Sequence, residues 1–111
     1  MIRVTVLPAA ELDMLEQVEF YDGEGGNAAL GDRFVAACEA GFARLSSFPE
    51  SGAPVRLQHP KIQGIRFIPV PDFHDILILY QIRDGAVRIV RVLHGKRDIQ
   101  AILRQESTPE I

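Results

Sequence analysis

The chain has 111 residues, of which 47% are hydrophobic, and a formal net charge of −3. This length favours one domain, and so much apolar content excludes a disordered chain, because it is enough for a folded core. No apolar run approaches the roughly 20 residues that a membrane-spanning helix needs, and the single cysteine, Cys38, excludes an internal disulfide. We therefore expect a soluble protein of a reducing compartment, without a signal peptide.

The N-terminal half predicts a short strand and two helices. Alternating residues at 2–6 indicate the strand, and Pro8 suits the first turn of a helix. The residues of this helix that we expect to face inward are Leu12, Leu15, Val18 and Tyr21. The glycine-rich segment 22–26 ends it, and Asn27 is placed to cap a second helix with an apolar stripe up to Leu45. The short link predicts an antiparallel helical hairpin.

The C-terminal half predicts a small sheet. Residues 49–63 contain three prolines and a glycine and are expected to form a loop. A strand follows at 64–70, in which Pro69 indicates an edge or a bulge. Two apolar runs, 76–82 and 87–93, flank an Asp-Gly pair and predict a β-hairpin. The first hairpin strand is apolar on both faces, so we expect it to be central and covered on both sides.

A last short helix, capped by Asp98, completes the chain, with Ile99, Ile102 and Leu103 toward the sheet. The element order is therefore β-α-α-β-β-β-α. It predicts a two-layer α+β fold, in which the helical hairpin packs on a small, mostly antiparallel sheet of about four strands. We expect one domain over residues 1–104 and a polar tail over residues 105–111.

Charge is divided unevenly along this layout. Residues 1–55 contain 3 Lys and Arg against 9 Asp and Glu, a balance of −6, whereas residues 56–111 contain 9 against 6, a balance of +3. Such asymmetry indicates that the basic half meets an acidic partner, with an unevenly charged solvated surface as the alternative.

The turn after the last predicted strand concentrates groups that can bind an anion. Arg97 can hold a phosphate or a carboxylate through two parallel hydrogen bonds, and His94 can move protons near neutral pH. Lys96 adds charge to the same turn. The alternative is that these side chains are solvated and only end the strand. The sequence favours a binding role for Arg97.

For the other candidate residues, the sequence predicts structural roles rather than catalytic or metal-binding ones. Strand alternation places Arg91 on the face of Ile89 and Leu93, so we expect it to be partly buried. Cys38 lies on the apolar helix stripe, where a buried structural thiol is expected. No spacing of histidine, cysteine or carboxylate residues matches a metal site, so no metal is expected.

Four segments resemble the RelE/ParE toxin superfamily. They are Pro8-Ala9-Ala10 and residues 48–54 (FPESGAP), 64–67 (GIRF) and 89–98 (IVRVLHGKRD), and the similarity extends over about residues 2–104. The last segment is the most specific and is similar to the ParE branch. The resemblance implies the toxin of a bacterial type II toxin–antitoxin system, cytoplasmic and without a cofactor, that a small ParD-like antitoxin neutralises.

The superfamily has two activities. RelE-like members cut mRNA on the ribosome with several cations and a proton carrier. Arg97 matches one of these cations and His94 is a substitute proton carrier, but apolar residues stand where the other groups would be, at 67–70, Leu77 and Leu103. ParE-like members bind and inhibit DNA gyrase and are not regarded as enzymes. The resemblance therefore implies a gyrase inhibitor, with a ribosome-dependent mRNA endonuclease as the alternative and an inactive binding module as a third reading.

These readings assign different roles to the same residues. In the first, the antitoxin places apolar anchors and acidic side chains on the basic sheet half. The residues expected to bind or to support that surface are Arg66, Arg91, His94, Lys96 and Arg97. In the second, Arg97 and His94 are the catalytic residues.

Overall fold

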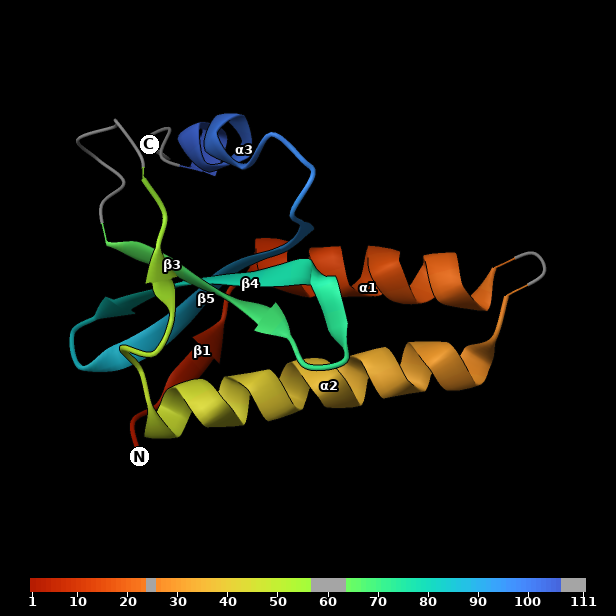
Figure 1. Cartoon of the computed structure of the whole chain (residues 1–111), viewed down its shortest axis with the longest axis horizontal. Helices are drawn as coiled ribbons and strands as arrows, with labels where there is room; N and C mark the ends of the chain where they lie inside the picture. Colours follow the sequence, from red (N-terminus) through yellow and green to blue (C-terminus); the bar gives the residue numbers. More distant parts are fainter. Residues whose placement is uncertain (24–25, 57–63, 107–111) are drawn as a thin grey trace.

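The computed structural model describes residues 1–23, 26–56 and 64–106, which form a sheet, a helical hairpin and a short third helix (Figure 1). The strands are β1 (Val4–Val6), β2 (Ala53–Pro54), β3 (Ile65–Val70), β4 (Phe73–Arg83) and β5 (Ala86–His94). The helices are α1 (Pro8–Asp22), α2 (Ala28–Ser47) and α3 (Ile99–Glu106). The predicted element order is confirmed, with β2 as an additional short strand in the segment predicted as a loop.

The sheet has the strand order β1-β5-β4-β3-β2, in which β1 is parallel to β5 and the other pairs are antiparallel. The helical hairpin lies on one face and α3 on the other (Figure 1). Strand β4 is central, and its side chains enter both cores. Ile78 and Tyr80 pack beneath the hairpin, whereas Leu77 and Leu79 pack on the side of α3. The predicted two-sided cover of this strand is confirmed.

Local signals in the sequence account for the turns and caps. Asp84 and Gly85 have φ angles of 53° and 72°, the left-handed pair that a tight hairpin turn requires. The side chain of Asn27 accepts a hydrogen bond of 2.9 Å from the N–H of Ala29 at the start of α2, so this predicted cap is confirmed. Asp98 caps α3 in the same way.

The side of helix α1 that faces the core is not the predicted one. The side chains that pack inward are Ala10, Met14, Val18 and Tyr21. Leu12 and Leu15 are 59% and 56% exposed, so their predicted inward position is wrong. The helix has apolar residues on every side, and its rotation is set by Asp13, which is 8% exposed and is turned toward β5.

A β-bulge interrupts the alternation of β5. Leu79 of β4 faces Arg91 and the next residue, Tyr80, faces Ile89, so Val90 is an extra residue. Ile89 packs beneath the hairpin and Leu93 packs on the side of α3. The prediction that these two residues share one face is therefore wrong. A second register shift lies at Pro69 and Val70 of β3, where Pro69 predicts an edge position or a bulge.

None of the helices in the described ranges is both long enough and apolar enough to cross a membrane. Helix α3 includes residues 105 and 106, the first two residues of the predicted tail, and residues 107–111 lie outside the described structure.

Candidate functional site

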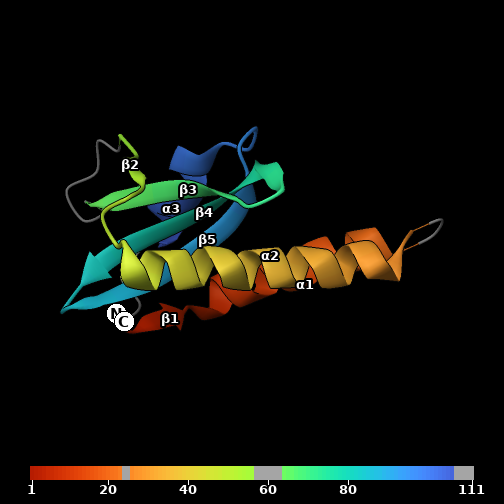
Figure 2. The same ribbon diagram turned by 60° about the horizontal axis from the view of Figure 1, so that its bottom comes forward.

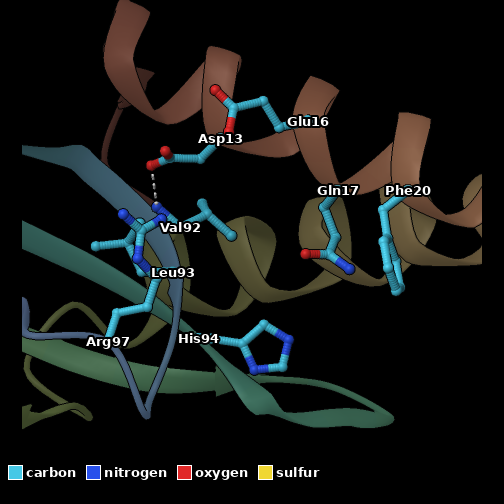
Figure 3. A pocket seen from close by; sticks show the side chains of 8 residues that line it. All are labelled: Asp13, Glu16, Gln17, Phe20, Val92, Leu93, His94 and Arg97. Carbon is cyan, nitrogen blue, oxygen red and sulfur yellow. Dashed lines mark hydrogen bonds between the residues drawn. The ribbon is translucent and has the colours of Figure 1, made fainter.

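The C-terminal end of β5 has a cavity on each side. The helix-edge cavity, of about 250 Å³, lies between α1 and β5, with Glu16, Gln17 and Phe20 on the helix and His94 on the strand (Figure 3). The α3 cavity, of about 330 Å³, lies between the sheet and α3. Arg97 lines both cavities. The predicted anion-binding turn therefore lies between two hollows of different character.

Asp13 joins α1 to β5 beside the helix-edge cavity. Its carboxylate accepts hydrogen bonds of 2.7 Å from both Nε and Nη2 of Arg91. It also accepts one of 2.9 Å from the backbone N–H of Val92 (Figure 3). Strand β1 stops pairing with β5 at Ile89, so Val92 lies on the strand edge beyond it. Asp13 thus takes the place of a neighbouring strand for that N–H group.

Two of the predicted site residues make contacts within the chain. Arg91 is partly buried as predicted, with a side-chain exposure of 17%, but for a different reason. It pairs with Asp13, which is 78 residues away in sequence and is not indicated by the pattern of the strand. Arg66 donates hydrogen bonds to the backbone oxygens of Gly52, at 2.8 Å, and Glu50, at 3.2 Å. Both arginines therefore hold the scaffold together.

His94, Lys96 and Arg97 are exposed. Within the described ranges, their side chains make no hydrogen bond or ion pair. The N–H of Arg97 donates to the carbonyl oxygen of His94 at 3.1 Å, which fixes the turn. The structure brings His94 and Arg97 to one cavity, and Lys96 does not line it. Glu16 lines the same cavity, so the basic pair faces negative charge from α1.

The α3 cavity has apolar walls. Phe67, Leu77, Leu79 and Ile99 line it, and Arg56 and Arg97 are the basic residues that also line it. This hollow therefore fits an apolar side chain better than a phosphate group.

A second basic group lies on the sheet near the turn of the hairpin. Arg83 is paired with Ala86, Arg88 lies two residues further along β5, and Thr5 is the register partner of Arg88. Since side chains alternate along strands, Arg3, Arg83 and Arg88 share one face of the sheet, the one that carries α3. None of the three forms an ion pair or side-chain hydrogen bond with another residue of the described chain. We call them the arginine row; they come from three separate segments, so no regular spacing in the sequence marks the row, and it becomes visible only once the strands are paired.

The remaining candidate groups have a structural role or do not form a catalytic or metal-binding cluster among the described residues. Cys38 is buried, and burial, together with the charge of Glu39, raises its pKa to about 12. It is therefore a neutral thiol in the core. Among the residues that the structure describes, no three His, Cys, Asp or Glu side chains lie close enough to hold a metal ion. His59 lies outside this part of the chain.

Comparison with known proteins identifies the family. A sequence model described as "ParE toxin of type II toxin-antitoxin system, parDE" matches residues 4–99. Among solved structures, the chain is similar to "Chromosomal ParDE TA system from P. aeruginosa", with a TM-score of 0.62 and 13% identity, over 85% of this chain and 96% of that one. At this identity, the structural similarity supports the fold alone. No curated protein matches the sequence.

The family match extends from β1 to the first residue of α3 and therefore includes the helix-edge cavity, the basic turn and all residues described around the α3 cavity except Gln100. It confirms the ParE branch to which the segment at residues 89–98 is similar. The chain belongs to the ParE toxin family of type II toxin–antitoxin systems.

Proposed function

We propose that this toxin inhibits DNA gyrase by binding it and that a ParD-like antitoxin neutralises it in the bacterial cytoplasm. The apolar α3 cavity is the observation that carries the proposal. RNA cleavage requires cations that hold the scissile phosphate and stabilise its developing charge. Phe67 and Leu77 line this cavity at two positions where the resemblance to RelE-like members would place such cations, although Arg56 and Arg97 also line it. The two apolar side chains favour binding over catalysis.

The surroundings of His94 and Arg97 support the same function. Both line the helix-edge cavity together with Glu16 and the buried Asp13. The charge of Asp13 is already paired with Arg91, but a phosphate that entered this cavity would also meet the exposed carboxylate of Glu16, and like charges repel. The pair is therefore better suited to a contact between proteins than to an RNA phosphate.

The antitoxin has a basic surface to bind. In this proposal, His94, Lys96 and Arg97 contact it, together with the arginine row, while Arg66 and Arg91 support the surface from inside. An acidic antitoxin segment that folds on binding would place its carboxylates on these side chains and an apolar residue in the α3 cavity. Lys96, Arg97 and the arginine row offer it five positive charges.

A supercoiling assay with purified gyrase tests the proposal. We expect the toxin to block supercoiling, and we expect the product of the neighbouring reading frame, as the candidate antitoxin, to restore it. A heat-denatured sample of the toxin serves as the control. Full supercoiling at a large molar excess of folded toxin would contradict the proposal.

Primer extension on translated message tests the alternative activity. After induction of the toxin, a gyrase inhibitor leaves the message intact and induces the response to DNA damage. Discrete cuts within codons, lost on substitution of Arg97 and His94, would instead identify an mRNA endonuclease.

A further inference from the structure

Helix α1 presents apolar side chains to solvent as well as to the core. Leu12, Leu15 and Phe20 are 59%, 56% and 75% exposed. A helix that carries large apolar side chains on its outer side as well as on its inner side normally packs against a partner on both. Helix α1 packs against α2 on one side and β5 on another, and it runs beside α2 (Figures 1 and 2). In Figure 1 no other element of the described chain lies over the C-terminal half of α1. Exposed apolar patches of this kind mark interaction surfaces.

The exposed side chains form one stripe. With 3.6 residues per turn, Leu12, Leu15 and Phe20 fall within an arc of about 140° and extend over about 12 Å of the helix axis. Acidic residues lie within this arc or at its rim. We call this set the outer face of α1: Glu11, Leu12, Leu15, Glu16, Glu19 and Phe20. It has the length of about two helical turns.

Charge decides what can cover this face. Helix α1 contains five acidic residues and no basic one. Asp13 is paired with Arg91, but Glu11, Glu16 and Glu19 are exposed. A second copy of the same face would bring carboxylates against carboxylates, which is unfavourable. A partner with Lys and Arg beside its apolar residues would complement both the charge and the stripe.

We propose that the outer face of α1 binds an amphipathic helix of a partner protein in which Lys and Arg flank the apolar residues. Such a helix lies along α1 and inserts its apolar side chains between those of the stripe. Phe20 belongs both to the stripe and to the wall of the helix-edge cavity (Figure 3), so one larger side chain of the partner can enter that hollow. The surface selects a basic partner, whereas the arginine row selects an acidic one.

Two designed peptides test the proposal with the full chain. Each has about 18 residues, since shorter helices are marginal in water, and a stripe of leucines. Lysines flank the leucines in one peptide and glutamates flank them in the other. In fluorescence anisotropy, we expect the lysine peptide to bind and the glutamate peptide not to bind. Amide shifts in an NMR titration should be largest in α1.

Two double variants test whether the lysine peptide binds to the stripe itself or to any exposed apolar side chain. Leu12→Ser with Phe20→Ser should weaken binding about tenfold or more, because exposed aromatic and aliphatic anchors dominate such contacts. Phe48→Ser with Ile82→Ser is the matched control. These two side chains are 65% and 37% exposed and lie outside α1, so we expect a change below about twofold.

A second pair of variants tests the charge. Glu16→Gln with Glu19→Gln should weaken binding and reduce its dependence on salt, since two screened attractions are lost. Asp32→Asn with Glu39→Gln removes two exposed charges from α2 and should leave both quantities nearly unchanged. Circular dichroism confirms that every variant is folded.

Three results would overturn the proposal: equal binding of the two peptides, binding of neither, or equal losses in the test and control variants. A dimer of the free toxin that Leu12→Ser with Phe20→Ser disperses would assign the face to a second copy and would also overturn it. Gyrase has no part in these measurements, so their failure is distinct from failure of the proposed function.

Discussion

The carboxylate of Asp13 and the guanidinium of Arg91 meet through two hydrogen bonds of 2.7 Å and so join α1 to β5. The same carboxylate accepts the N–H of Val92 at the strand edge. One side chain therefore orients the first helix, neutralises an arginine and completes the sheet where β1 ends.

Substitution of Asp13 should destabilise the fold strongly. Asp13→Ala leaves the guanidinium of Arg91 and the N–H of Val92 without this partner, and breaking a buried ion pair costs about 3 kcal/mol of unfolding free energy. Urea denaturation measures the loss. Glu16→Ala, one turn away at an exposed position, is the control and should change stability by less than about 0.5 kcal/mol. Similar losses in the two variants would show that Asp13 has no special role.

The hydroxyl of Tyr80 should contribute more to the stability of the fold than the hydroxyl of Tyr21. Tyr80 is fully buried and accepts the N–H of Gly52 at 2.8 Å, so Tyr80→Phe leaves a buried donor unpaired at a cost of about 1–2 kcal/mol. The hydroxyl of Tyr21 has no hydrogen bond within the described ranges, and Tyr21→Phe should be nearly neutral. Thermal unfolding of both variants compares their stabilities, and an equal loss of stability in the two would contradict the structure.

Cys38 should make stability depend on pH at the alkaline end. Its pKa is about 12 in the folded chain against 9.0 for an unperturbed thiol, so the folded state holds the proton more tightly. The resulting stabilisation is complete below pH 9 and is lost as the pH rises toward 12. The stability difference between the native chain and Cys38→Ala should therefore be constant near neutral pH and should shrink at about pH 10. A constant difference over the whole range would refute a buried neutral thiol.

Removal of one charge from the arginine row should stabilise the free toxin slightly. Arg88→Gln relieves repulsion from Arg3 and Arg83, which is worth about 0.5 kcal/mol between neighbouring strands at low salt. The gain should vanish near 1 M salt, where the screening length is about 3 Å. Arg44→Gln, at an exposed position of α2, is the control. A gain that persists in high salt would indicate a cause other than charge.

The parts of the fold with local signals were predictable from the sequence. The Asp84-Gly85 turn, the Asn27 cap and the central position of β4 each depend on residues close together in the chain, and each is confirmed. The orientation of α1 was not predictable in this way. Its apolar residues are compatible with several rotations, and the contact that selects one, from Asp13 to Arg91, joins residues 78 positions apart.

The candidate site was predictable in part for the same reason. Sequence placed His94, Lys96 and Arg97 together because they are neighbours in one turn. It could not show that α1 contributes Glu16 to the same cavity. The bulge at Val90 also changed which side chains of β5 share a face, and a bulge leaves no clear trace in the alternation of apolar residues.

The pairing of β1 with β5 has a consequence for how the toxin is made. Val4 is the register partner of Val87, whose N–H donates a hydrogen bond to the carbonyl oxygen of Arg3, so the parallel edge of the sheet can close only after most of the chain has left the ribosome. The helical hairpin is synthesised long before the strands on which it packs. Because contacts between such distant residues form slowly, a nascent toxin should stay unfolded and harmless until translation is nearly finished.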